Sequence, residues 1–517
     1  MAALVVTVLL AGPSAYLVWR NFSNDADPAG LLFSRQTLEP LWRTIQLAFL
    51  VSASSALIGT MTAWLTTRTD LPARRLFRVL LPLPLVYPTF IGAAALVRTL
   101  NPGGLANDGL RSVGIDQTVQ LDGLLGAWWV LTLFTYPYVY LPVAARFARL
   151  PGSIEQSARL LGTSGLDVFR RVILPQARGS IITGTLLVFL YTISDFGAVA
   201  ILRYDTLTRA IEANQLANRP VALALSLILM ILAAIVVAAE RWVQRRRPVD
   251  SAPRSTINRP TELGRWTVPA FGGLALLSLN ALGAPLAAIL DWSIRGLTRG
   301  DRGGRGLTVD AEEIVDITTN TLSISALAAA VTIATVFPIA ILVGRHRSRI
   351  GSLGYVVAIS TFALPGVLIA LAVKFWTLQW DWTFDTFNDT LGILVFAYVV
   401  RFAALAMGST LIAVESVPSR VRDAGQTLGA SSARRLRTVD IPMMAPGLLA
   451  AAGLVLLSTM KELPISLLLA PIGVETLATR IFGTFNESFV AEAGLMALVL
   501  VAMSFVATWF LVIRNAD

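Results

Sequence analysis

Two polar stretches in an otherwise apolar chain decide its architecture: PGSIEQSARLLGTSGLDVFRRVILP at 151–175 and PSRVRDAGQTLGASSARRLRTVDIP at 418–442. Each stretch starts with small and polar residues, which are followed by a glycine and then by a basic amphipathic segment that ends in proline. The glycine and the proline are Gly162 and Pro175 in the first stretch, and Gly429 and Pro442 in the second. Glycine commonly ends a helix, and proline is tolerated in the first turn of the next one. Because both stretches are too polar to cross a bilayer, we expect each to form a short helix on the membrane face that offers small residues to a partner.

The remaining sequence has the composition of a membrane protein. The chain has 517 residues, of which 55% are hydrophobic and 14% charged, whereas soluble domains carry about 25% charged residues. This composition excludes a soluble enzyme, a disordered protein and a fibrous protein. The absence of cysteine excludes disulfides and thiolate metal sites, and the single histidine, His346, leaves little histidine-based metal or general-base chemistry.

Twelve apolar stretches have about the 20 residues that a bilayer-spanning helix needs. Their runs are continuous and not alternating, which favours helices over a β-barrel. We predict an all-α polytopic membrane protein with about 12 spans at 2–19, 44–66, 79–100, 123–145, 179–201, 221–243, 266–291, 320–343, 352–376, 391–414, 444–469 and 490–513.

The arginines predict how these spans are oriented. Arginine-rich segments follow the second, fourth, sixth, eighth and tenth spans, all on one side, whereas the opposite loop 377–390 has three aspartates and no basic residue. The positive-inside rule makes the arginine-rich side cytoplasmic, with both termini in the cytoplasm. The net charge of +10 therefore reflects topology in a cell membrane and contact with lipid, and we expect no nucleic-acid partner.

The sequence contains an internal duplication of one module. An offset of 277 residues relates Thr44 to Thr321 and Pro88 to Pro365, and an offset of 267 relates the two glycines and the two prolines of the polar stretches. We predict a first module at 1–247, a cytoplasmic linker at 248–262 and a second module at 263–517. Two six-span halves of the same orientation imply a parallel pseudo-two-fold pair.

The two polar stretches resemble the loop signature of binding-protein-dependent ABC importer permeases, in which Glu-Ala-Ala is followed by three residues, a glycine, nine residues and an aliphatic-x-Leu-Pro end. The corresponding triplets are Gln156-Ser157-Ala158 and Asp423-Ala424-Gly425, and Ile441 replaces the leucine of the second copy. The resemblance implies the type I importer permease fold. It also implies that each loop is a coupling helix, docked on one of two cytoplasmic ATPase subunits.

The chain has no P-loop for binding a nucleotide. A P-loop requires Gly-Lys-Ser or Gly-Lys-Thr, but the two lysines, Lys374 and Lys461, follow valine and methionine. We therefore expect a transport subunit that is not an enzyme and binds no cofactor. The partner ATPase would bind ATP and magnesium.

Two acidic residues fall inside predicted spans at equivalent positions, and ionisable groups inside a span are functional candidates. Asp195 precedes Gly197 by two residues, and Glu462, next to Lys461, precedes Pro464 by two residues. About 17 residues of helix place Asp195 about 25 Å from the cytoplasmic end of its span, which favours a pathway or an outer gate. A buried pair that stabilises helix packing is the alternative.

A second repeat follows each acid. DTLTRAI at 205–211 matches ETLATRI at 475–481 with one inserted residue, so Asp205 and Arg209 parallel Glu475 and Arg480. These residues lie on the predicted external side, where they could contact a substrate-delivering binding protein. A local salt bridge that shapes each loop is the alternative.

The segments SDFGAV at 194–199 and KELPISLLLAP at 461–471 most resemble the fused permeases of ferric-iron importers. The resemblance implies Fe³⁺, free or chelated, delivered by an external binding protein; related fused permeases carry thiamine or aminophosphonates. The sequence contains no built-in metal site. A proton-coupled secondary transporter that uses Asp195 and Glu462, and an ion channel, are alternatives from other classes, but neither requires two coupling loops.

Overall fold

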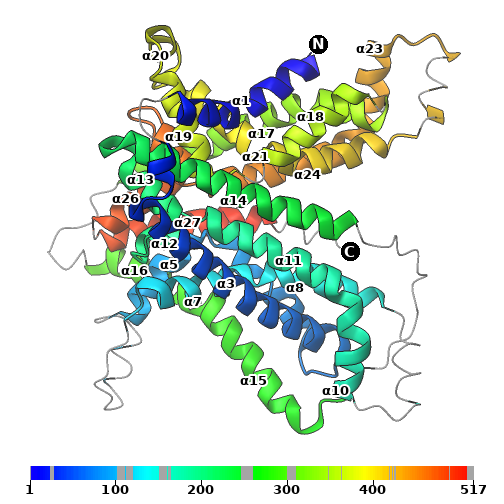
Figure 1. The fold of residues 1–517 in the computed structure, drawn as a ribbon. Helices are drawn as coiled ribbons and strands as arrows, with labels where there is room; N and C mark the ends of the chain where they lie inside the picture. Colours follow the sequence, from blue (N-terminus) through cyan, green and yellow to red (C-terminus); the bar gives the residue numbers. More distant parts are fainter. Residues whose placement is uncertain are drawn as a thin grey trace. The chain divides into compact units, whose positions relative to one another are not determined.

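The computed structural model describes residues 2–23, 28–101, 107, 111, 120–150, 160, 165–245, 260–299, 310–346, 348–361, 364–418, 420, 421, 423, 427–487 and 489–508. The regular elements in these ranges are all helices (Figure 1). Thr69 and Thr261 form an isolated bridge, and the described ranges contain no strand. The prediction of an all-α polytopic protein is therefore confirmed.

Ten helical stretches in the described ranges are long and apolar enough to cross a membrane, or eleven if a bent pair counts as one span. The elements that form the ten are α1 (Ala2–Phe22), α3 (Arg35–Arg68), α7 (Gly123–Thr135) with α8 (Pro137–Arg149), α11 (Leu174–Ser194), α14 (Arg219–Arg245), α15 (Thr267–Ser278) with α16 (Ala284–Arg299), α17 (Ala311–Gly344), α21 (Leu391–Glu415), α24 (Ile441–Met460) and α27 (Val490–Thr508).

Two of the twelve predicted spans are interrupted, which accounts for the difference in number. The stretch 79–100 is divided among α4 (Arg74–Leu80), η1 (Leu83–Val86) and α5 (Thr89–Leu100), with a bend of 100°. The stretch 352–376 is divided between α18 (Arg349–Ser360) and α19 (Gly366–Thr377). Pro88 and Pro365 directly precede α5 and α19. Proline lacks an amide donor and disfavours helical backbone in the residue before it, so it interrupts both spans at the same place.

Three π-helical turns also precede prolines: η2 (Phe169–Ile173), η4 (Leu279–Gly283) and η6 (Leu436–Asp440). A proline lies two residues after each turn, at Pro175, Pro285 and Pro442. Proline cannot donate the usual helical hydrogen bond, and a π-helical turn, which is wider than an α-helical turn, accommodates it. Consequently the basic part of each polar stretch continues into the following membrane helix without a break, through α10 (Gly165–Val168) and η2 into α11, and through α23 (Ser432–Arg435) and η6 into α24.

The chain folds into two compact units, each built from both halves of the sequence. Unit 1 comprises Met1–Thr37, Ile211–Met230 and Arg295–Asp517, and unit 2 comprises Leu38–Ala210 and Ile231–Ile294. In unit 1, α17, α21 and α24 pack against one another, and α1 packs on α18 and α19. The Asn21 amide links α1 to α14 through the Leu223 carbonyl at 3.1 Å. The module boundaries at 247 and 263 describe the sequence repeat and stay a prediction.

In unit 2, the backbones of α3 and α11 lie close to α8. Helix α8 packs on α11, and a Cβ added at Gly184 would lie 2.8 Å from the Val139 Cα. A Cβ at Gly59 of α3 would lie 2.8 Å from the Val139 Cβ. The missing side chains let α3 and α11 pack closely on α8, as small residues do in membrane helix interfaces. The shorter elements are α2 (Pro28–Leu32), α12 (Gly197–Ile201), α13 (Leu207–Ala217), η3 (Gly264–Trp266), α20 (Asp381–Phe387), α25 (Pro464–Leu469) and α26 (Leu477–Asn486).

Candidate functional site

The coupling loops are described only in part. The predicted contact residues Gln156, Ser157, Ala158, Gly162, Ala424 and Gly425 lie outside the described residues. In the second loop, the Thr427 hydroxyl donates to the Asp423 carbonyl at 3.0 Å, across one helical turn. Gly429 has a φ of +75°, the left-handed conformation in which a glycine ends a helix. Leu160 and Leu428 are 88% and 86% exposed, so each loop presents a large apolar side chain.

Two equivalent arginines, 277 residues apart, connect the loops to the membrane helices in different ways. Arg68 is buried and donates to the Leu150 carbonyl at 2.7 Å, at the start of the first loop. Arg345 forms an ion pair of 2.6 Å with Asp440, at the end of the second loop, where the side chains are 7% and 1% exposed. Arg435 lies 3.8 Å from the same carboxylate. The charge pattern identified these arginines only as cytoplasmic, and their equivalence was not recognised from the sequence.

Asp195 is buried at the end of α11, where three segments meet. Its carboxylate accepts a hydrogen bond of 2.5 Å from the Thr89 hydroxyl at the start of α5 and one of 3.0 Å from the Ala198 amide in α12. Its carbonyl accepts from the Thr208 hydroxyl of α13 at 2.7 Å. Gly197 is the first residue of α12. Asp195 thus joins α5, α11, α12 and α13, and these contacts fix the position of its carboxylate.

Glu462 has the equivalent position in the second module, with a different neighbour. The residue that corresponds to Thr89 is Gly366, and a Cβ added there would overlap the Glu462 Oε1 atom. The Glu462 carbonyl accepts from the Ser466 hydroxyl at 2.6 Å, which lies 2.5 Å from the Tyr398 hydroxyl. The longer acid therefore faces a glycine, and the shorter acid faces a threonine. Both carboxylates lie beside the first residue of the helix that follows the proline break.

Lys461 and Pro464 lie in the turn around Glu462. Lys461 is the residue that follows α24, and Pro464 is the first residue of α25. Helix α25 packs on α19 and α21. The disruptors that the sequence identified after each acid, Gly197 and Pro464, therefore both begin short helices.

The predicted docking residues of the first module form ion pairs with each other. Arg209 pairs with Asp205, and Arg43 of α3 pairs with the same carboxylate at 3.4 Å. Arg43 also pairs with Glu39 at 2.5 Å. These ion pairs shape the loop before α13. Because the side chains are 33–55% exposed, they also remain accessible to a partner.

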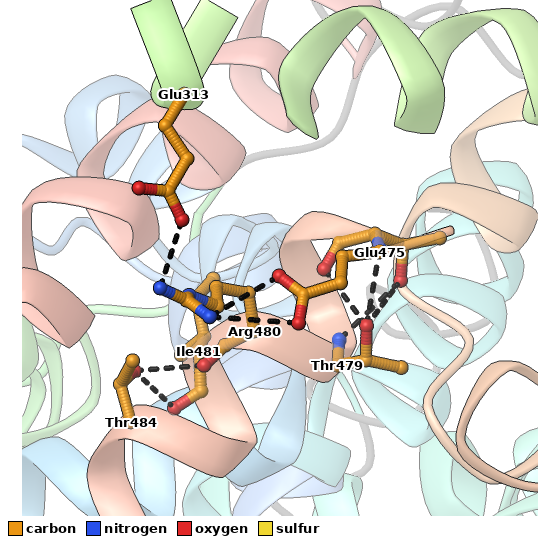
Figure 2. Close-up of polar contacts among 7 residues, drawn as sticks. Glu313, Glu475, Thr479, Arg480, Ile481 and Thr484 are labelled. Carbon is orange, nitrogen blue, oxygen red and sulfur yellow. Dashed lines mark hydrogen bonds and ion pairs between the residues drawn. The ribbon is translucent and has the colours of Figure 1, made fainter. Parts of the chain in front are cut away.

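The second module repeats this arrangement with different partners (Figure 2). Arg480 of α26 lies between two carboxylates, at 2.8 Å from Glu313 of α17 and 3.4 Å from Glu475. The side chains of the three residues are 29–46% exposed. As in the first module, an arginine connects the loop to the start of a long helix.

The threonines that revealed the repeat form equivalent caps in the two modules. The Thr44 hydroxyl of α3 accepts a hydrogen bond of 2.8 Å from the Leu207 amide at the start of α13. The Thr321 hydroxyl of α17 accepts one of 2.8 Å from the Leu477 amide at the start of α26. Each satisfies an amide that a helix start leaves without an intrahelical acceptor. The sequence marked both threonines as equivalent but not their function.

Sequence reasoning did not single out Arg401, an ionisable residue inside a membrane helix. Arg401 is the eleventh of the 25 residues of α21, and its guanidinium donates to the Leu364 carbonyl, between α18 and α19. Its charge within the predicted span 391–414 was itself a signal for a functional site. In the described ranges, no group of three or more His, Cys, Asp or Glu residues could bind a metal ion.

Both halves of the chain match a known protein family. Residues 55–248 and 336–515 match the family described as binding-protein-dependent transport system inner membrane component. The Fe(3+)-transport system permease protein FbpB 2 of Haemophilus influenzae is 27% identical over 93% of this chain and 91% of its own length.

Two further relatives align with a part of this chain about as long as one module. The sulfate transport system permease protein CysW of Escherichia coli K12 is 26% identical over 41% of this chain and 74% of its own length. A probable molybdenum ABC transporter permease protein of Haloferax volcanii is 28% identical over 40% and 77%. The two matched segments cover more than half of the chain and coincide with the duplication, so the chain belongs to the binding-protein-dependent inner-membrane permeases of ABC transporters.

Proposed function

We propose that this chain is the fused permease subunit of an importer for ferric iron. The observation that carries the cargo proposal is the match to an Fe(3+)-transport permease across both modules, 93% of this chain and 91% of the relative. The sulfate and molybdenum permeases match at similar identity but over only 40–41% of this chain. An oxyanion cargo is therefore the second candidate.

Two copies of an ATPase subunit would dock on the stretches 151–175 and 418–442, and those subunits would bind ATP and magnesium. The exposed Leu160 and Leu428 would contribute apolar contacts to the docking surfaces. Because the basic half of each stretch continues into α11 or α24, movement of a docked loop would be transmitted directly to a membrane helix. A binding protein would deliver cargo near the Asp205–Arg209 and Glu475–Arg480 pairs, on the side opposite the coupling loops, with both chain termini in the cytoplasm.

The coupling assignment is tested by replacing Gly162 and Gly429 with valine in the same chain. A β-branched residue is unfavourable at the positive φ of Gly429, and the bulk would also occlude the docking surface. We expect loss of co-purification with the ATPase and of ATP-dependent ⁵⁵Fe uptake. Gly272→Val, at a helix position where a Cβ meets no atom within 4 Å, is the control. Retention of both binding and uptake by the double variant would refute the assignment.

The acids Asp195 and Glu462, with Gly197, Lys461 and Pro464, are proposed to form the gate of the pathway. Asp195→Asn with Glu462→Gln preserves volume and removes both charges, so we expect slower uptake in a complex that still assembles. Normal uptake by this variant would assign the acids to packing alone. Uptake without ATP, driven by a proton gradient, would instead support the secondary-transporter alternative.

A further inference from the structure

Arg401 lies near the middle of the long helix α21. Ten residues separate it from Leu391 at the start of α21, which corresponds to about 15 Å along the helix at 1.5 Å per residue. The hydrocarbon core of a bilayer is about 30 Å thick. The partner carbonyl, Leu364, lies in the break before α19, whose 12 residues extend about 18 Å from there. Both helices therefore place this contact near mid-membrane.

The guanidinium has donors left over for a ligand. It has five N–H groups, and its one hydrogen bond in the described part of the chain goes to the Leu364 carbonyl. Among the same residues it forms no ion pair, and none of its nitrogens is buried without a hydrogen bond. Arg401 is intermediate in exposure. The charge is thus accessible and unneutralised.

An unneutralised charge at this depth requires a polar environment. A charged side chain is costly at the bilayer centre, and such residues face a bundle interior or a water-filled cavity. Tyr398 is one turn earlier on α21 and is buried, with its hydroxyl 2.5 Å from the Ser466 hydroxyl of α25. Arg401 lies on the same side of α21. The arginine accordingly faces the polar interior of unit 1, where Glu462 also lies.

Several other arginines in the described part of the chain are paired with carboxylates. Arg43, Arg209, Arg345 and Arg480 each form an ion pair with a carboxylate. Lys374, in the last turn of α19, and Arg219, whose guanidinium lies 5.6 Å from the Phe375 ring, form no ion pair among the described residues. Unit 1 therefore has basic groups that form no ion pair among the described residues both at Arg401 and at the far end of α19, an arrangement that favours an anionic group over a bare metal cation.

We propose that Arg401 contacts the cargo by binding an oxyanion group, a carboxylate or a tetrahedral oxyanion, during translocation. A guanidinium donates two parallel hydrogen bonds to such groups. This inference rests on the proposed import function and specifies its cargo: iron crosses as a complex with an anionic oxygen ligand. The same chemistry would bind a free oxyanion, and the experiment separates the two sources.

The test uses the complete importer, this chain with its ATPase and binding protein, in proteoliposomes supplied with ⁵⁵Fe³⁺-citrate or [³⁵S]sulfate. Arg401→Gln removes the charge and Arg401→Lys keeps it. For whichever cargo the wild type carries, we expect Gln to lower uptake about tenfold or more, equivalent to about 1.4 kcal/mol, and Lys to stay within about threefold. Arg265→Gln, an exposed arginine beside Trp266, is the control for loss of a positive charge.

The outcomes distinguish this inference from the proposed function. If the wild type carries iron and Arg401→Gln carries it equally well, the oxyanion contact is wrong and the import function stands. If wild-type liposomes accumulate neither label, the cargo proposal fails and this inference fails with it. If Arg401→Gln does not assemble, Arg401→Lys decides: near-normal uptake supports the charge role, whereas an assembled Lys variant without uptake refutes it. Sulfate uptake alone would identify the free oxyanion as the cargo.

Discussion

Replacing Asp440 by alanine should destabilise the second module more than any comparable change at an exposed ion pair. The carboxylate is 1% exposed and lies 2.6 Å from Arg345, which is itself 7% exposed. Removing one partner of a buried pair leaves an uncompensated charge and typically costs about 3–5 kcal/mol. Arg435, at 3.8 Å from the same carboxylate, would also lose its counter-ion, so the upper part of that range is expected.

The assay is denaturant unfolding of the purified permease in detergent, arranged as a double-mutant cycle. Asp440→Leu combined with Arg345→Leu should be much less destabilising than Asp440→Leu alone, because well-packed apolar residues can replace a buried ion pair at little cost. Glu39→Gln is the control, since its pair with Arg43 is 35–44% exposed and should contribute about 0–1 kcal/mol. A loss below about 1 kcal/mol for Asp440→Ala, or a double variant no more stable than the single, would show that the ion pair does not stabilise the helix junction.

Two further changes test the duplicated contacts. Thr321→Val leaves the Leu477 amide without its 2.8 Å acceptor, which should cost about 1–3 kcal/mol and speed hydrogen exchange at the start of α26; Ser323→Ala on the same helix should change neither, and unchanged exchange in the valine variant would show that the cap is dispensable. Gly366→Thr should displace the Glu462 carboxylate and slow uptake. Adding Glu462→Asp should restore uptake by rebuilding the contact of the first module, and a double variant as slow as the single would refute this equivalence.

The parts of the fold that follow from local chemistry were accessible from the sequence. Apolar run length located the membrane helices, and the two offsets identified the duplication that the family matches show. Pro88 and Pro365 were recognised as equivalent, but the sequence alone did not show that they interrupt their spans. The interruption depends on whether a helix kinks or breaks at proline, and packing with neighbouring helices decides this.

Contacts across the fold were not accessible in the same way. Thr44 and Thr321 act as helix caps for amides 163 and 156 residues away, and no local pattern encodes such a distance. Arg401 has Phe134 at the 267-residue offset, so the repeat gave no indication of its importance. The assignment of α1 to the unit formed mainly by the second module likewise depends on packing between helices that are far apart in sequence.

Asp195 and Glu462 differ in length, and so do the residues that face them, but each carboxylate lies beside the first residue of a helix that follows a proline break. In the first module a threonine hydroxyl reaches a short acid at 2.5 Å; in the second, a glycine leaves room for a longer acid that extends into the same place. A site required only to fill space could use an apolar side chain, without the penalty for burying a carboxylate. The compensating change in size keeps a carboxyl group at the start of each helix that follows a proline break. Packing therefore explains how each acid is positioned, whereas the presence of an acid in both modules is explained better by a function of the carboxyl group itself.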